Sequence, residues 1–150
     1  MPKSDLSGIE ASYLKEAYRL RESGRLPSVS VLAHGFRVTM PSVIDVLQKL
    51  ERRGLVHRTP WKVPTLTKKG LAEARRIIHS HRVLEVYYGE ALGLDETYAC
   101  AEAAKIDYLI GTKAVERMCD TLHHPARCLH GFTIEHVKNG RMLKPAALEG

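Results

Sequence analysis

The sequence predicts a mainly α-helical protein with a small β-hairpin wing. An N-terminal winged helix-turn-helix over residues 1–75 is expected to precede a helical dimerisation domain over residues 76–150. Residues 1–75 contain fourteen Lys or Arg against seven Asp or Glu, whereas residues 76–150 contain nine against ten. All three cysteines and six of the eight histidines lie in the second half. The first half therefore favours contact with phosphates, and the second half favours metal binding.

The composition excludes several classes of protein. The chain has 150 residues, 44% of them hydrophobic, which is enough for one ordinary domain or two small ones. No apolar run is long enough to span a membrane, and the start lacks the apolar stretch of a secretory signal. Three cysteines are too few for a disulfide scaffold. We expect a cytoplasmic protein with reduced thiols, and the net charge of +6 suggests an acidic partner.

Three helices are expected in the first half. Apolar residues at steps of three and four predict an amphipathic helix over residues 9–23, closed by Gly24. Ser28 or Ser30 can cap a short second helix that buries Val31, Leu32 and Phe36. The third helix is expected to start at Thr39 and to run to Gly54.

The third helix has two distinct stripes. The stripe expected to face the core contains Thr39, Val43, Val46, Leu47 and Leu50. The opposite stripe is polar, and near its start its side chains are small, as required of a helix whose N-terminal end enters a major groove. It contains Pro41, Asp45, Gln48, Lys49 and Arg52.

A hairpin is expected after these helices. Two β-like runs, residues 55–59 and 63–67, flank a basic, aromatic tip at Pro60, Trp61 and Lys62. Arg37, Arg52, Trp61 and Lys62 are the expected contacts to the DNA backbone. A winged-helix module whose basic face binds an acidic protein is an alternative.

The second half contains a candidate metal site on two helices. On a helix expected over residues 71–89, His81 and Glu85 stand four apart and project from one face. On the next, expected over residues 96–110, Cys100 and Asp107 stand seven apart on one stripe. Such a set of N, O and S ligands suits iron, manganese, cobalt or zinc. The alternatives are a solvated His81–Glu85 ion pair and a Cys100 that acts as a small buried apolar residue.

A second candidate metal site lies further along the chain. Cys119 and His123 stand four apart, and with Cys128 and His130 they match a Cys2His2 zinc site. The alternative is that Cys119 belongs to the core, and His79 is expected at the surface. Three cysteines also permit an iron-sulfur cluster, although their spacing matches no common cysteine motif of iron-sulfur proteins.

The second half presents more apolar helix surface than it can easily bury alone, which predicts a two-fold homodimer. This surface contains Leu92, Leu94, Tyr98, Ile106, Leu109, Ile110, Val115, Met118 and Leu122. We expect Leu94, Tyr98, Ile106, Leu109, Ile110 and Met118 to make the dimer contacts. A dimer supplies two recognition helices, as binding to double-stranded DNA at a palindromic operator requires.

Several segments of the chain resemble the diphtheria toxin repressor family of metal-dependent transcriptional regulators. These are residues 13–18, 42–56, 66–70, 81–85, 92–95 and 124–134, which together extend over about residues 9–134. The resemblance is to the short, manganese-regulator form of the family, which lacks an SH3-like domain. It implies a winged helix, a helical dimerisation domain, and a divalent metal that favours DNA binding.

The resemblance assigns roles to individual residues. It implies a recognition helix that begins with Thr39, Pro41, Ser42 and Asp45, of which Asp45 departs most from the family pattern. It places His81, Glu85 and Asp107 at ligand positions, and Cys100 where relatives often carry histidine. Ser12, Ala104 and Tyr108 replace ligands of the family's primary site, so that site is expected to be lost.

These observations predict a homodimeric, metal-responsive repressor of metal-uptake genes. A metal-independent or thiol-based redox-sensing regulator is the alternative. The sequence contains no nucleophile elbow, glycine-rich phosphate loop or framed pair of carboxylates, so an enzyme is not expected.

Overall fold

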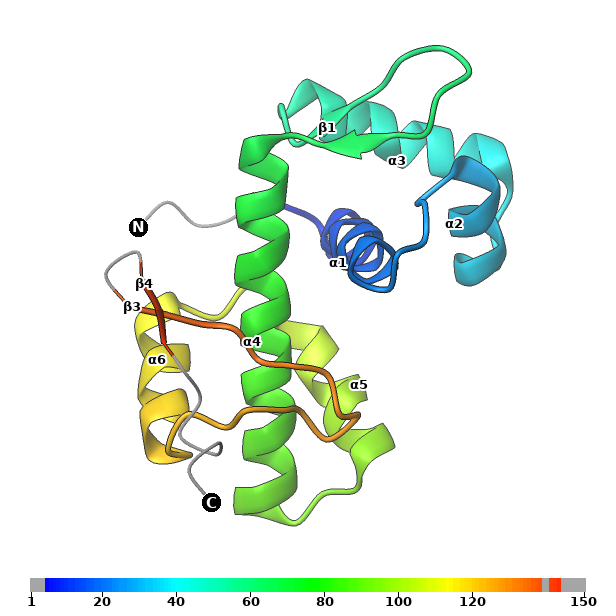
Figure 1. Cartoon of the computed structure of the whole chain (residues 1–150). Coiled ribbons are helices and arrows are strands. Elements are labelled where there is room, and N and C mark those ends of the chain that lie inside the picture. The colour runs from blue at the N-terminus through cyan, green and yellow to red at the C-terminus, as the bar shows by residue number, and fades with distance from the viewer. Residues whose placement is uncertain (1–4, 139–140, 144–150) are drawn as a thin grey trace. The chain divides into compact units, whose positions relative to one another are not determined.

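The computed structural model describes residues 5–138 and 141–143, which form two compact units (Figure 1). One unit comprises Asp5–Ile77, and the other begins at Ile78. Helix α4 (Lys68–Leu92) contributes its first part to the N-terminal unit and the remainder to the C-terminal unit.

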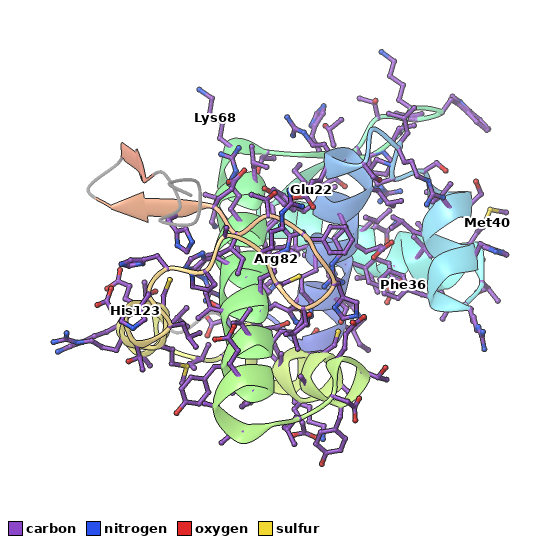
Figure 2. The ribbon with its side chains drawn as sticks, turned by 60° about the horizontal axis from the view of Figure 1, so that its bottom comes forward. Glu22, Phe36, Met40, Lys68, Arg82 and His123 are labelled. Atoms are coloured by element: carbon purple, nitrogen blue, oxygen red, sulfur yellow. The ribbon has the colours of Figure 1, made fainter. Side chains whose placement is uncertain are left out.

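Serine and threonine caps define the three helices of the N-terminal unit. Ser7 forms a capping box with Glu10 at the start of α1 (Gly8–Glu22). Ser28, the first of the two expected candidates, caps α2 (Val29–Phe36), and Thr39 caps α3 (Met40–Arg52). Figure 2 labels Phe36 at the end of α2 and Met40 at the start of α3. Between them, Arg37 adopts a left-handed conformation with φ 54°, which makes the tight turn of a helix-turn-helix.

The core of the N-terminal unit follows the expected apolar stripe of α3, except at Thr39. The buried residues of this stripe are Val43, Val46, Leu47 and Leu50. Thr39 is exposed instead of buried, because its hydroxyl accepts the backbone N–H of Ser42 at the helix end. The rings of Tyr13 and Phe36 stack with centroids 4.4 Å apart, which joins α1 to α2.

The wing is shorter in regular structure than the sequence predicts. Strand β1 (Val56–His57) pairs antiparallel with β2 (Thr65–Leu66), whereas runs of five residues were expected on each side. Pro60 and Pro64 have no backbone N–H to donate to the ladder, so pairing stops early. Trp61 at the tip has φ 63° and is fully exposed.

In the C-terminal unit, α4 lies between α5 (Glu96–Ile106) and α6 (Thr112–Thr121), as both Figure 1 and Figure 2 show. A short hairpin of β3 (His136–Lys138) and β4 (Arg141–Leu143) follows. Arg82 of α4 donates to the carbonyl of Thr133 at 2.8 Å and so holds the loop that precedes this hairpin. The apolar core contains Val83, Val86, Val115, Cys119, Cys128 and Ile134.

Three helix boundaries in this part of the chain differ from those predicted. Helix α4 begins before residue 71 because the Thr67 side chain accepts the backbone N–H of Gly70, and it ends at a left-handed Gly93. Helix α5 ends at Ile106 instead of residue 110, because the backbone N–H groups of Leu109 and Ile110 both turn back to the Ile106 carbonyl.

The apolar surface expected to form the dimer divides into two parts. Val115 belongs to the core of its own chain, whereas Ile110, Met118 and Leu122 pack against that core and are partly buried, as Leu94 is. The exposed part consists of Leu92, Tyr98, Ile106 and Leu109. Within the described residues, no helix combines the length and the apolar character needed to cross a membrane.

Candidate functional site

Three side chains predicted as metal ligands come together between α4 and α5. One ligand atom each from His81, Glu85 and Cys100 lies within 4.8 Å of the other two. His81 Nε2 is 3.6 Å from Glu85 Oε2 and 3.5 Å from Cys100 Sγ. The helical repeat places His81 and Glu85 on one face of α4, and α5 brings Cys100 opposite them. Imidazole, carboxylate and thiol groups at these separations can bind a first-row divalent metal.

Asp107, the fourth predicted ligand, lies on the other side of the His81 ring. Its Oδ2 accepts a hydrogen bond from His81 Nδ1 at 2.9 Å. Because a carboxylate only accepts, this contact places the ring proton on Nδ1 and leaves Nε2 with the lone pair in the neutral imidazole. Asp107 therefore orients His81 and is not a member of the group of converging ligand atoms.

Glu85 is shared with a second group of side chains. One ligand atom each from Glu85, Cys128 and His130 lies within 4.8 Å of the others. Glu85 Oε1 accepts the backbone N–H of His130 at 3.2 Å and also contacts His130 Nδ1, while His130 Nε2 lies 3.0 Å from Glu96. His130 thus connects the first candidate site to the loop that carries Cys128.

The structure does not bring together Cys119, His123, Cys128 and His130, the four residues of the second candidate site. Cys128 and His130 lie with Glu85, and His123 is exposed at the end of α6. Cys119 instead lies with His79 and His136, one ligand atom of each being within 4.8 Å of the others. No pattern in the sequence points to His136, since sixteen residues separate it from Cys119 and only the fold closes that distance.

Burial governs the ionisation of the groups around Cys119. Burial raises the pKa of the Cys119 thiol to about 11, and the nearby Asp120 carboxylate acts in the same direction. Burial also lowers the pKa of His79, which was expected at the surface, and its neighbour His136 lowers it further. In the metal-free protein these groups are a neutral thiol and a neutral imidazole at pH 7. Each of the three groups of ligand atoms found among the described residues contains a single cysteine, so none of these groups supplies the several thiolates that usually hold an iron-sulfur cluster.

The side chains expected to contact DNA are all exposed on the N-terminal unit. They are Arg37, Thr39, Pro41, Ser42, Asp45, Gln48, Arg52, Trp61 and Lys62. Asp45 forms an i,i+4 ion pair with Lys49 at 2.9 Å. This pairing offsets the negative charge of Asp45, the residue that fits a phosphate-facing helix least well.

A helix-turn-helix with a wing, followed by a helical unit with converging metal ligands, defines the class of metal-binding transcriptional regulators. Comparison with known proteins identifies the family. Residues 5–62 match the model of the iron dependent repressor N-terminal DNA binding domain, and residues 67–136 match that of the iron dependent repressor metal binding and dimerisation domain. The chain therefore belongs to the iron-dependent repressor family, which includes the diphtheria toxin repressors.

Individual relatives agree with this assignment. The chain is 33% identical over 107 residues to an uncharacterized HTH-type transcriptional regulator of Methanocaldococcus jannaschii, covering 71% of this chain and 86% of that protein. It is 28% identical over 130 residues to the diphtheria toxin repressor of Corynebacterium efficiens, covering 87% of this chain and 56% of that protein. The structure of the manganese regulator SloR superposes with a TM-score of 0.76 at 29% identity, covering 91% of this chain and 63% of SloR.

The family confirms the predicted fold class and the predicted kind of function. Its members are metal-dependent transcriptional repressors with a DNA-binding domain and a metal-binding and dimerisation domain, so the expectation of a regulator, and not an enzyme, is correct. The chain spans little more than half the length of the corynebacterial repressors that it matches.

Proposed function

We propose that this protein is a homodimeric repressor whose affinity for DNA increases when a divalent metal binds at His81, Glu85 and Cys100. The observation that carries the proposal is the convergence of these three ligand atoms within 4.8 Å. The second ring nitrogen of His81, Nδ1, is hydrogen-bonded to Asp107. A histidine ligand whose second N–H is donated to a carboxylate is a common arrangement in metal sites.

The charges of this region fit a cation. The Glu85 and Asp107 carboxylates are 1% and 0% exposed, respectively, and both contact the His81 ring. Buried carboxylates are costly unless a positive charge or hydrogen bonds offset them. A divalent cation would supply that charge and would join α4 to α5. Because α4 also provides the last residues of the DNA-binding unit, ligands on this helix are well placed to influence DNA binding.

The donor set limits the metal without identifying it. One imidazole, one carboxylate and one thiolate suit iron, cobalt or zinc, and manganese less well, because thiolate favours softer ions.

We propose that the start of α3 enters the major groove, with Arg37, Arg52 and Lys62 contacting phosphates. The two-fold dimer would then bind a palindromic operator, at genes of metal uptake or homeostasis, in the cytoplasm where chromosomal DNA lies.

The test is the dependence of DNA affinity on metal. An operator is first selected from a random duplex pool with protein and cobalt, and binding is then followed by fluorescence anisotropy with and without added manganese, iron(II), cobalt or zinc. We expect metal to tighten binding at least about tenfold, which corresponds to a coupling of about 1.4 kcal/mol. His81→Ala should abolish this response while keeping the weak metal-free binding.

A metal-independent regulator is the second candidate, and specific residues favour it. Ser12 and Ala104 stand where the resemblance places ligands of the family's primary site; the Ser12 hydroxyl donates to the Gly8 carbonyl, and Ala104 has no ligand atom. If wild type and His81→Ala bind the operator equally well at every metal concentration, this second candidate replaces the first.

A further inference from the structure

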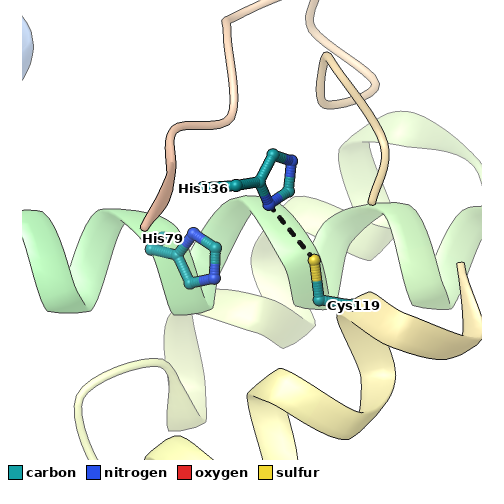
Figure 3. Close-up of side chains that lie close together, drawn as sticks. All are labelled: His79, Cys119 and His136. Atoms are coloured by element: carbon teal, nitrogen blue, oxygen red, sulfur yellow. Dashed lines mark hydrogen bonds between the residues drawn. The ribbon is translucent and has the colours of Figure 1, made fainter. Parts of the chain in front are cut away.

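The group of side chains around Cys119 lies apart from the site proposed to control DNA binding. Figure 3 shows His79 on α4, Cys119 on α6 and His136 at the start of β3 facing one another. His79 and His81 are two residues apart on α4, so they project from opposite sides of that helix. The first site lies between α4 and α5, and this group lies between α4 and α6.

A fourth side chain borders the same sulfur. Cys119 Sγ is 3.4 Å from His136 Nδ1 and 3.4 Å from His124 Nδ1. The His124 and His136 rings meet edge to face with centroids 5.4 Å apart. Ligands of a tetrahedral zinc ion, with one sulfur and three nitrogens, are separated by about 3.5 Å, given Zn–S and Zn–N distances of roughly 2.3 and 2.0 Å.

Each of the three imidazoles has its outward nitrogen bound to an oxygen that only accepts. His136 Nε2 donates to the Pro125 carbonyl at 2.8 Å, and His79 Nδ1 donates to the Glu135 carbonyl at 2.9 Å. His124 Nε2 lies 3.3 Å from Asp120 Oδ1. In neutral rings, these contacts leave the lone pairs on His136 Nδ1, His79 Nε2 and His124 Nδ1.

Hydrogen bonding alone does not satisfy this arrangement. The Cys119 thiol carries one proton, but two lone-pair nitrogens, from His124 and His136, face it at equal distances. One S–H group can donate to only one of them. A cation at the centre would bind the Cys119 thiolate and the lone pairs of His79 and His136, whose ligand atoms lie within 4.8 Å of one another, and His124 Nδ1 beside the sulfur would be the fourth donor. The outward hydrogen bonds are those that orient histidine ligands in known metal sites.

We propose that Cys119, His79, His136 and His124 form a second metal site, which takes Zn²⁺ or another divalent ion that accepts thiolate and imidazole. The thiol proton is released to solvent as the metal–sulfur bond forms, and the metal keeps its oxidation state. The site joins α4, the end of α6 and the start of β3. Its role is to hold the dimerisation unit together, independently of the metal response at His81.

Cobalt spectroscopy on the 150-residue chain can isolate this site, because each cysteine is assigned by elimination. In Cys100→Ser/Cys128→Ser, Cys119 is the only thiol left, and Co²⁺ added to the metal-free protein should give one equivalent bound, with a sulfur-to-cobalt band in the near ultraviolet. In Cys100→Ser/Cys119→Ser, only Cys128 remains and the band should be absent. A band of equal strength in both proteins, or in neither, overturns the proposal.

Two adjacent histidines provide a matched pair of variants. In the Cys100→Ser/Cys128→Ser protein, His124→Ala should weaken cobalt binding at least about tenfold, whereas His123→Ala, beside it but exposed and outside the group, should not.

Circular dichroism establishes that each variant is folded. Should Cys119→Ser fail to fold, His79→Gln replaces it, with loss of cobalt affinity as the expected result and unchanged affinity as the contrary one. Adding His81→Ala to the Cys100→Ser/Cys128→Ser protein should leave this band unchanged, so the two proposals fail separately.

Discussion

His81 Nδ1 and Asp107 Oδ2 lie 2.9 Å apart in the interior of the C-terminal unit, and this contact determines which nitrogen of His81 faces Glu85 and Cys100. The two residues come from α4 and from the end of α5, so the hydrogen bond also positions one helix against the other. The metal binding proposed at this site would therefore depend on Asp107, which lies outside the group of converging ligand atoms.

Substitution of Asp107 tests that dependence. We expect Asp107→Ala to weaken metal binding roughly 10–100-fold, because His81 loses the acceptor that orients it. Asp107→Asn should have a smaller effect, since its amide oxygen still accepts the Nδ1 proton. Calorimetric titration with cobalt measures the metal affinity of each variant. Equal affinity in wild type and Asp107→Ala would show that the contact has no part in metal binding.

The basic surface of the N-terminal unit should control DNA affinity through charge. Arg37→Glu combined with Lys62→Glu is expected to weaken binding at least about tenfold and to reduce the slope of log K against log salt by about 2, one unit for each lost phosphate contact. Anisotropy titrations over a range of salt concentrations provide the slope. Lys113→Glu with Arg117→Glu, on exposed residues of α6, makes the same change in net charge elsewhere and should leave the slope unchanged.

The exposed apolar residues near α5 should hold the dimer together. Tyr98 and Leu109 are 53% and 61% exposed in the single chain, and lysine at both positions would bury two charges in an apolar interface. We expect Tyr98→Lys/Leu109→Lys to sediment as a folded monomer at tens of micromolar protein. Leu26→Lys alters an equally exposed leucine of the N-terminal unit and should remain dimeric. A dimeric double variant would exclude this surface.

Gly70 should be intolerant of any side chain. A Cβ added there would lie 1.8 Å from the Leu55 carbonyl oxygen, so the start of α4 would have to move away from the wing. We expect Gly70→Ala to reduce the free energy of unfolding by about 3 kcal/mol, the upper end of the usual cost of overpacking, because the contact is with backbone atoms that cannot rotate away. Gly35→Ala, where nothing lies within 4 Å, should be neutral or stabilising by up to about 1 kcal/mol. Urea denaturation of the two variants gives the comparison.

Glu10 should make the stability of the protein depend on pH. Burial raises the pKa of this carboxyl, but hydrogen bonds from Ser7 and Arg53 outweigh burial and hold the pKa below its ordinary value of 4.5. A carboxyl with a lowered pKa in the folded state stabilises the protein above pH 4.5, and this stabilisation is lost as the pH falls through the folded-state pKa. Glu10→Gln should therefore reduce stability by about 1–2 kcal/mol at pH 7 and by less below pH 4.

Urea denaturation at several pH values checks this expectation, with the exposed Glu90→Gln as the control. A difference between Glu10→Gln and wild type that stays constant down to pH 3 would contradict it.

The order of elements in the DNA-binding unit could be predicted because local interactions determine it. A cap such as Thr39 and the apolar stripe from Val43 to Leu50 act within a few residues, so the position of α3 is visible in the sequence. The same holds for His81 and Glu85, which one helical turn brings to a single face. Helix ends were predicted less well, since Thr67 and Ile106 set them through individual hydrogen bonds.

The sequence by itself therefore determined the family, the two-unit plan and the residues that stand one turn apart on a helix. Only the tertiary structure decided which distant side chains meet. It brought His79 and His136 to Cys119 in place of His123, and it directed Asp107 to the outer nitrogen of His81. The physical reason is that spacing along a helix specifies a face, whereas contact between segments depends on how their apolar surfaces pack.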